Sequence, residues 1–576
     1  MPKRQNIVAP NYGGGLNTSE GPEISKDGLS PTQLTQAYNW RFTGSGGCST
    51  RTGFELQSNI GTSAKIDNLW THEPYSVMFG KSDTAIYQTL DGLTWYTIGV
   101  TRTATETEDF SSIEKDVHVT NATDSYTRIA VSTISAINSG AGTMSVRVGD
   151  GGKFASATFY VRGTAITGGT ISGDNYTGLS GLTGSMAIGD IVTQTTAPSG
   201  APKATCLGLL EGATLAGGVS ANRAVLYYSA HATPDNPEFA YDYSANGASF
   251  KFLPTDIVDI GSITGGAIIA LKKGLHYAST FEVTSEELLT TEIHVNFGGI
   301  NNKCLVQGQK MTYLLDARNK RIIPIISDVN GVSVVDDPLN QRKNLDYPVQ
   351  GFMSTIDTDQ TNSGTSFDPV TTEVKFTVIK NGISYDVVFQ ENVGRWSIDL
   401  GKNFRCRALF NGRIWAGSDS SDDIYLENEG YTDNGVEINH RLVSAVYTVD
   451  DKRMTMEFLN FICGGILSTL GEFTLRMYVD DTKVFDELIT ADELVLKGLM
   501  SRTSGTPIGA GTVGDTTIGS GGTAPTGYRF TCPYDILFSG ESYQFEIEIM
   551  DEGTQMELRD SRLDFETENE TILSFF

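Results

Sequence analysis

Histidine and cysteine are the residues of this sequence best suited to nucleophilic or metal chemistry, and both are sparse. Local metal and catalytic motifs need them at short spacings such as CxxC or HExxH, and neither spacing occurs. The histidines are His72, His118, His231, His276, His294 and His440, and the cysteines are Cys48, Cys206, Cys304, Cys406, Cys463 and Cys532. We predict no metal site, and we expect the cysteines to be small buried residues of a reducing cytoplasm.

Three short segments superficially resemble ligand-binding loops. Residues 80–82 (Gly-Lys-Ser) lack the glycine-rich lead-in of a phosphate loop, and residues 13–15 (Gly-Gly-Gly) do not join a strand to a helix. Residues 419–423 (Asp-Ser-Ser-Asp-Asp) lack the glycine that a Ca²⁺ loop needs at its sixth position, so an acidic hairpin turn explains them better. The sequence predicts no catalytic, cofactor-binding or metal-binding residues.

Catalytic motifs of the common hydrolases and nucleotide-dependent enzymes are missing as well. The chain contains no GxSxG elbow and no GxxxxGK[ST] loop. A carboxylate pair of the glycosidase kind stays open, because such a pair is assembled in space and has no fixed sequence spacing. We therefore expect a protein that is not an enzyme, without a cofactor.

The elements that position these residues are predicted to be short β-strands throughout. Runs of four to eight β-branched and aromatic residues alternate with Gly, Asn, Asp and Ser, and Asn381-Gly382 and Asn411-Gly412 suit tight hairpins. Turn signals about ten residues apart are typical of a sandwich, barrel or propeller. Loosely similar units of 40 to 60 residues favour an all-β fold containing a β-propeller of about six blades. Several unrelated β-domains in series are the alternative.

Two changes in composition divide the chain. Residues 133–205 are rich in Gly, Thr, Ala and Ser, which predicts a small β-barrel or sandwich inserted in a propeller loop. After residue 440 the strands lengthen, which predicts a C-terminal β-sandwich. The expected organisation is an N-terminal arm (1–40), a first propeller segment (41–132), the inserted domain (133–205), the remaining blades (206–440) and an acidic C-terminal sandwich (441–576).

The 576-residue chain is strongly acidic, with 69 acidic and 42 basic residues and a formal net charge of −27. Tight binding to nucleic acid needs clustered Lys and Arg, so this charge argues against it. Residues 535–576 contain twelve acidic and two basic residues. They form either a solvated face or a wall that does not retain a sliding polyanion; Glu546, Glu548, Asp551 and Glu552 are the carboxylates expected at such a wall.

Targeting and membrane signals are not expected in this sequence. The first residues lead into turn residues without an apolar run, which predicts no signal peptide. No stretch reaches the ~18 apolar residues of a membrane-spanning helix, and residues 456–470 are better explained as buried strands.

Several segments, in a fixed order, resemble a pattern of bacteriophage tail proteins. A Gly14-Gly15-Leu16-Asn17 opening leads to Ala37-Tyr38-Asn39-Trp40, then Gly47, then an Arg51-Thr52-Gly53-Phe54 corner. Later segments are residues 225–230, 271–277, 312–316 and 414–418, and finally Gly430-Tyr431-Thr432-Asp433. Over about residues 10–130 and 205–440 the chain resembles the tail nozzle and tail-hub propeller proteins of short-tailed phages, also called tail tubular protein B or packaged-DNA stabilisation proteins.

This resemblance implies a structural virion protein that is assembled in the host cytoplasm. Such proteins form homohexameric rings below the portal and adaptor, carry tail fibres or spikes, and make the lower conduit that retains DNA and passes it during ejection. Rings of this kind use heterologous interfaces that close by rotation. The alternatives are a glycan-binding or polysaccharide-degrading propeller of the tail, and a free-standing interaction propeller, which the lack of a regular repeat disfavours.

Overall fold

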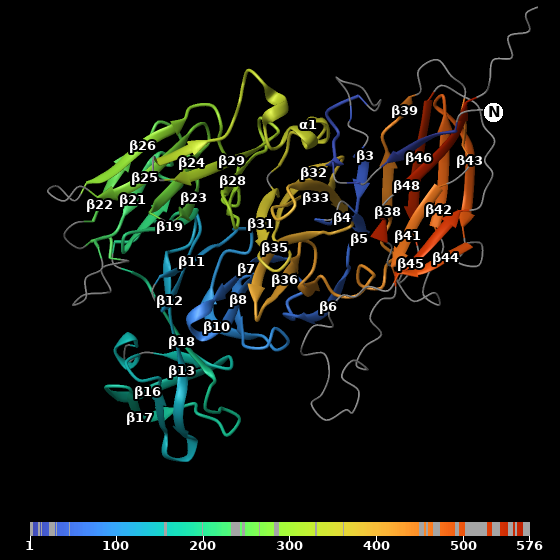
Figure 1. Cartoon of the computed structure of the whole chain (residues 1–576). Coiled ribbons are helices and arrows are strands. Elements are labelled where there is room, and N and C mark those ends of the chain that lie inside the picture. The colour runs from blue at the N-terminus through green and yellow to red at the C-terminus, as the bar shows by residue number, and fades with distance from the viewer. Residues whose placement is uncertain are drawn as a thin grey trace, which may run out of the picture.

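The computed structural model of the chain is built almost entirely of β-strands (Figure 1). It describes residues 4–9, 12, 14–21, 29, 32–44, 47–113, 115–154, 158–198, 200–231, 242–244, 248–263, 265–281, 287–328, 331–360, 362–448, 454–456, 459–464, 473–489, 495–500, 527–532, 542–550, 557–558 and 561–567. The α-helix in this part of the chain is α1 (Tyr347–Met353). Among the described residues, no helix is long and apolar enough to cross a membrane.

Five separate four-stranded antiparallel sheets form most of a propeller. Blade 1 is β7 (Ile66–His72), β8 (Val77–Ser82), β9 (Ala85–Thr89) and β10 (Tyr96–Thr101). Blade 3 is β19 (Cys206–Leu210), β20 (Ala213–Gly217), β21 (Val225–Tyr228) and β22 (Ser249–Phe252). Blade 4 is β23 (Ile257–Ile263), β24 (Gly266–Leu271), β25 (Leu275–Phe281) and β26 (Leu288–His294). Blade 5 is β27 (Leu305–Gln307), β28 (Thr312–Asp316), β29 (Arg321–Asp328) and β30 (Gly331–Val334).

The last of the separate sheets closes the ring with a strand from the N-terminal region. This sheet, blade 7, contains β35 (Phe404–Phe410), β36 (Arg413–Ser418), β37 (Asp423–Glu427) and, as its outer strand, β6 (Phe54–Asn59). Strand β6 pairs with β37 over Asn59↔Asp423 to Phe54↔Glu427, so the first and last parts of the propeller are hydrogen-bonded together. Closing the ring this way leaves the last blade with a full set of four strands.

Two further four-stranded units complete the ring inside larger sheets. Blade 2 consists of β11 (Asp109–Ile113), β12 (Asp116–Thr120), β13 (Thr127–Asn138) and β18 (Ile191–Thr196), and blade 6 of β31 (Gly364–Asp368), β32 (Glu373–Lys380), β33 (Ile383–Gln390) and β34 (Arg395–Leu400). The first strands of the blades contact one another in the closed order β7, β11, β19, β23, β27, β31, β35 and β7. The predicted propeller is confirmed, and with these two units it has seven blades, against about six expected.

Tight turns that accept a positive φ make the narrow blades possible. Asn381 and Gly382 join β32 to β33 with φ of 52° and 72°, and Asn411 and Gly412 join β35 to β36 with φ of 50° and 74°. Two successive residues at positive φ match the right-handed twist of the flanking strands. The sequence signal for hairpins therefore has a direct structural cause.

The inserted domain is a closed six-stranded barrel, as expected from the sequence. It grows out of blade 2 between β13 and β18, and its strands follow the order β13-β14-β17-β16-β15-β18 with β18 pairing back to β13. Its other strands are β14 (Thr143–Val146), β15 (Phe159–Val161), β16 (Thr164–Ser172) and β17 (Asn175–Ser180). The long strand β13 belongs to both blade and barrel, and the barrel lies below the propeller in Figure 1.

Blade 6 continues into the C-terminal part of the molecule through one large sheet. Its outer strand β34 pairs with β3 (Gln33–Tyr38), and the sheet goes on through β38 (His440–Ser444), β46 (Ser542–Ile549), β42 (Phe473–Val479) and β43 (Thr482–Ile489). Two short strands, β2 (Gly15–Leu16) and β39 (Tyr447–Thr448), pair at its side. One hydrophobic core runs along this sheet, from Val374 and Phe376 of blade 6 to Leu475 and Phe545.

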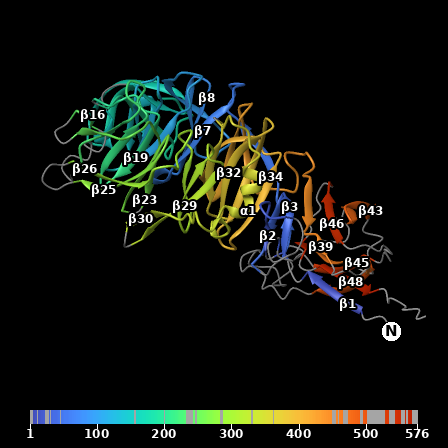
Figure 2. The same cartoon turned by 90° about the horizontal axis from the view of Figure 1, so that it is seen from above.

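Three small sheets complete the C-terminal region and include strands from the start of the chain. The first is β1 (Arg4–Ala9), β48 (Ser561–Thr567) and β40 (Met454–Met456). The second is β4 (Trp40–Phe42), β5 (Cys48–Thr50) and β47 (Glu557–Leu558), and the third is β41 (Leu459–Gly464), β45 (Gly527–Cys532) and β44 (Val495–Met500). Figure 2 shows β1 beside β48 at the end of the molecule away from barrel strand β16. The N-terminal strands up to β5 thus pair with the C-terminal region and blade 6, and the propeller proper starts with β6.

We predict that Gly53→Ala destabilises the ring closure. A Cβ at this position would lie 1.8 Å from the carbonyl oxygen of Thr432, so the backbone on both sides must move. Overpacking of this kind typically costs about 1–3 kcal/mol of unfolding free energy. Thermal unfolding of the purified protein measures the loss; Gly184→Ala is the matched control, since nothing lies within 4 Å of its added Cβ. Equal melting temperatures for the two variants would refute the prediction.

Candidate functional site: the axial channel of the propeller

The first strands of the seven blades surround a central cavity of about 370 Å³. Polar and charged side chains from different blades line it, and the strands that carry them are short. The polar lining includes Asn68, Asp109, Ser111, Asp259, Ser262, Lys303, Gln307, Thr365, Ser366, Arg405 and Arg407. Its volume lies in the range of small-molecule sites.

Two aspartates of the lining connect one blade to the next. Asp109 Oδ2 on β11 accepts a hydrogen bond from the Leu207 backbone N–H on β19 at 2.7 Å. Asp259 Oδ2 on β23 accepts one from the Leu305 backbone N–H on β27 at 2.9 Å. The first strands of neighbouring blades have no backbone ladder between them, so these side chains satisfy N–H groups that would otherwise be buried without a partner.

The loop between blades 4 and 5 reaches across the axis of the ring. We call residues 299–303 the axial loop. The side chains of its last three residues donate hydrogen bonds to three different blades, or to the segments that lead into them. The bonds are Asn301 Nδ2 to Ser363 O at 2.7 Å before blade 6, Asn302 Nδ2 to Thr205 O at 3.0 Å before blade 3, and Lys303 Nζ to Asp67 O at 3.1 Å in blade 1. The loop therefore obstructs the channel and ties together blades that are not neighbours in the ring.

Burial shifts the pKa values of charged side chains that line the channel. Burial, together with the nearby charge of Asp259, raises the pKa of Asp109 to about 8. Burial also raises the pKa of Asp259 to about 6 and lowers the pKa of Lys303. At neutral pH the two aspartates therefore carry less negative charge than their number suggests.

The side chains of the channel are not arranged for nucleophilic covalent chemistry. Cys406 is the thiol beside Lys303, and burial raises its pKa, which disfavours the reactive thiolate. The lysine amine is already used as a donor to the Asp67 carbonyl and to Asn68 Oδ1 at 3.4 Å. Within the described residues, no group of three or more His, Cys, Asp or Glu could hold a metal ion. The hydrogen bonds that the lining makes therefore hold the blades in place.

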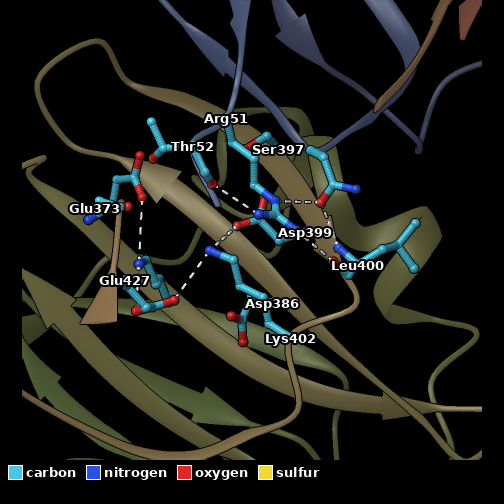
Figure 3. A network of polar contacts seen from close by, with 12 residues as sticks. Arg51, Thr52, Glu373, Asp386, Ser397, Asp399, Leu400, Lys402 and Glu427 are labelled. Carbon is cyan, nitrogen blue, oxygen red and sulfur yellow. Dashed lines mark hydrogen bonds and ion pairs between the residues drawn. The ribbon is translucent and has the colours of Figure 1, made fainter. Parts of the chain in front are cut away.

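A second polar cluster lies where blades 6 and 7 meet the N-terminal strands (Figure 3). This closure network contains five cations and five carboxylates, all of them largely buried. The cations are Arg41, Arg51, Lys375, Lys402 and Arg407, and the carboxylates are Glu373, Asp386, Asp399, Glu427 and Asp433. The equal numbers of opposite charges leave the cluster without a net charge.

Each carboxylate at the centre of the closure network has more than one cationic partner. Asp399 pairs with Arg41 at 2.6 Å and with Lys402 at 3.2 Å. Glu427 pairs with Arg407 at 2.9 Å and with Lys375 at 3.1 Å. Burial alone would raise the pKa of both acids, but these cations hold both pKa values well below the usual range.

The six histidines named in the sequence analysis are spread over different parts of the molecule. His72 is in blade 1, His118 in blade 2, His231 after β21, His276 and His294 in blade 4, and His440 on β38. Burial lowers the pKa of His72 to about 4, and those of His118 and His440 to about 3, so these three are neutral at pH 7. Their hydrogen bonds join segments of the fold: His72 bonds Ser112 and the Lys115 carbonyl of blade 2, and His440 bonds the Arg51 carbonyl at 3.4 Å.

The other residues named as possible ligand loops have structural roles. Lys81 is fully buried on β8, where its Nζ pairs with Asp67 and donates to the Glu106 carbonyl at 2.8 Å. In the 419–423 segment, which joins β36 to β37, Asp422 accepts from the backbone N–H groups of Gly61 and Thr62 at 2.7 and 2.8 Å and so ties this turn to the segment after β6. Cys48, Cys206, Cys304 and Cys406 are buried, as expected; the side chains of Cys463 and Cys532 lie outside the described residues.

The carboxylates proposed for a channel wall are neutralised where the structure describes them. Glu546 and Glu548 bond Arg476 at 2.7 and 2.6 Å, and Glu546 also bonds Arg441 at 2.9 Å. Burial alone would raise the pKa of Glu546, but the two arginines lower it below the ordinary value. The charge of these two residues is thus balanced by arginines, and their position at a conduit wall stays a prediction. Asp551 and Glu552 lie outside the described residues.

The residues that build the channel were missed by motif searching. Asn301, Asn302 and Lys303 form an ordinary polar loop in sequence, and their partners are distant in the chain. A weak signal does exist for the aspartates. Asp67, Asp109 and Asp259 each stand next to a large apolar residue in a short strand, where a buried carboxylate needs a specific partner.

Comparisons with known proteins do not assign the chain to a family. No family model and no curated protein matches its sequence. Solved structures that resemble it include two of the extracellular domain of a system from B. thetaiotaomicron, described as a hybrid two-component and as a one-component system. They are 10% and 9% identical, with a TM-score of 0.33 in both cases, over 74% and 76% of this chain. The matched regions span 44% and 48% of those longer chains.

We predict that Lys303→Met destabilises the whole propeller. The variant keeps much of the side-chain volume but leaves the Asp67 carbonyl and Asn68 Oδ1 without this donor, which typically costs about 1–3 kcal/mol. Chemical denaturation measures the change in unfolding free energy. Lys273→Met, at an exposed turn of blade 4, is the control and is expected to change little. A loss confined to Lys273→Met, or absent from both, would contradict the assigned role.

We also predict a pH dependence that comes from Asp109. Its folded pKa of about 8 lies above the unfolded value of ~3.9, so the folded state binds the proton more tightly and stability falls as pH rises towards 8. Asp109→Asn keeps an acceptor for the Leu207 N–H but cannot ionise. Between pH 6 and pH 9 the wild type should lose about 2.7 kcal/mol relative to this variant, since each pH unit below the folded pKa corresponds to about 1.4 kcal/mol. Parallel stability curves for the two proteins would show that Asp109 does not titrate in this range.

Proposed function

We propose that this chain is a structural protein of a bacteriophage tail, of the nozzle or hub kind, that acts without catalysis. Six copies would form a ring below the portal and adaptor, with tail fibres or spikes attached. The ring would retain the packaged DNA and pass it during ejection. Assembly would take place in the host cytoplasm, before the protein becomes part of the virion tail.

The observation that carries this proposal is the meeting of two segments of the phage-like pattern. Arg51 Nη1 bonds Asp433 Oδ1 at 2.7 Å. The Gly53 N–H donates to the Gly430 carbonyl, and the Phe54 N–H donates to the Thr432 carbonyl, both at 3.1 Å. The residues of the pattern thus join the first and last parts of the ring. This structural role supports the proposal of a structural protein that acts without catalysis.

The obstructed axial channel bears on where DNA would pass. A cavity of about 370 Å³ crossed by the axial loop has the size of a small-molecule site and does not suit a duplex. In the proposed assembly the conduit therefore lies between copies of the chain, on the axis of the ring. The net charge of −27 per chain supports a conduit that repels DNA phosphates more than it binds them.

The test of this proposal is the size and location of the assembly. The purified protein is expected to form a ring of six 62.2 kDa chains in light scattering and negative-stain images, and antibodies against it should label the tails of virions. A protein that stays monomeric at all concentrations and labels no tail would refute the proposal. Release of sugars from a polysaccharide would instead favour a glycan-degrading propeller.

A further inference from the structure

Three consecutive blades carry a cation in the same loop. Arg223 lies between β20 and β21 of blade 3, Lys272 between β24 and β25 of blade 4, and Arg318 between β28 and β29 of blade 5. Successive strands are antiparallel, so the loops between second and third strands fall at one end of every blade, together with the loops that join the blades. We call this end the loop face of the propeller.

The three cations line one cavity of the loop face, of about 420 Å³. We name this cavity the basic pocket. All three side chains belong to exposed residues, and Asn301, Asn302, Thr105, Thr107 and Thr205 add hydrogen-bonding groups to the lining. The volume is sufficient for a ligand of small-molecule size, and convergent polar groups in such a cavity are typical of a binding site.

Parts of the lining are held in place by hydrogen bonds. Arg318 Nη1 donates to the Lys272 carbonyl at 2.7 Å, which fixes its guanidinium beside the loop of the neighbouring blade. Asn302 is fixed by its bond to the Thr205 carbonyl at 3.0 Å. A pocket whose donors are held in this way loses less conformational entropy when a ligand binds.

Two carboxylates also line the basic pocket and have to be counted against the cations. They are Glu106 and Asp256. Glu106 Oε1 accepts a hydrogen bond from Thr123 Oγ1 at 2.9 Å, so part of its acceptor capacity is already used. Three cations against two acids leave an excess of positive charge, whereas the chain as a whole has 27 more acids than bases.

The opposite half of the loop face contains a cavity with more acidic than basic residues. A cavity of about 470 Å³ between blades 6 and 7 is lined by Asp357, Asp359 and Asp419, with Arg405 as its cation. Asp357 accepts from the backbone N–H groups of Asn381 and Gly382 at 2.8 and 2.9 Å. The basic pocket is therefore a local feature of blades 3 to 5, and the acidic cavity provides an internal comparison.

We infer that the basic pocket binds a small ligand that carries more than one oxyanion group, either phosphate or carboxylate. The three cations come from three separate blades, so each can contact a different anionic group of one ligand. A ligand with a single charge could not contact all three in this way. The guanidinium of Arg318 suits planar or bidentate recognition of such groups, and Lys272 supplies a point charge. This inference does not depend on the proposed tail function, because it concerns one propeller alone.

Calorimetric titration of the purified full-length protein at 50 mM salt tests the inference. The probes are tripolyphosphate for phosphate, trigalacturonate for carboxylate and maltotriose as the uncharged control. We expect at least one anion to bind, maltotriose not to bind, and the affinity to fall as salt is raised. Arg318→Gln and Lys272→Gln should each weaken binding about tenfold, as expected for loss of one charge-assisted contact.

Control variants separate a specific site from general charge effects. Arg413→Gln removes an exposed cation from the opposite end of blade 7, and Asp419→Asn changes the acidic cavity. Both should bind the anion as the wild type does, and all variants should melt at the wild-type temperature. Binding of neither anion, or equal weakening by Arg413→Gln, would overturn the inference. Ring assembly is measured separately on the same variants, so failure of the tail proposal would be recognised independently.

Discussion

Closure of the ring is the constraint on which the rest of this structure depends. A propeller is stable only when its first and last blades are joined, and here the joining strand β6 comes from a part of the chain that precedes blade 1. The chain must therefore leave the C-terminal region, pass blade 6 and enter blade 7 before the ring begins. The closure network lies along this path, with Arg41 and Arg51 from the N-terminal strands and Asp399 and Glu427 from the two blades.

Burying ten charges at this junction has physical consequences. Removing ions from water costs several kcal/mol for each ion, and the cost is offset only when geometry and hydrogen bonding are good. Partners supplied by three different segments satisfy this condition in one arrangement of the chain, so the network favours a single relative position of blade 6, blade 7 and the N-terminal strands. The sheet that continues from β34 through β3 to β43 extends this order into the C-terminal region.

The sequence predicted the kind of fold better than its details. Asn-Gly turns and short β-branched runs identify narrow antiparallel sheets, and the Gly- and Thr-rich composition after residue 133 marks the barrel, because both signals are local. The number of blades was harder to predict, since β6 is more than 360 residues from its partner strand β37 and β13 is shared with the barrel. The channel residues could not be identified for the same reason: Lys303 looks like a loop lysine until its partner Asp67 is placed opposite.

Polar residues in the channel and in the loop face follow different physical rules. In the channel, Asp109, Asp259 and Lys303 satisfy backbone groups of other blades, so substituting one of them leaves a buried group without a partner. On the loop face, Arg223 and Lys272 are exposed side chains of turns, and turns tolerate change. A propeller of this design keeps its centre fixed while the chemistry of its loops is free to vary. Ligand recognition is therefore expected at the loops, and the buried charges beneath them provide the rigid base that recognition requires.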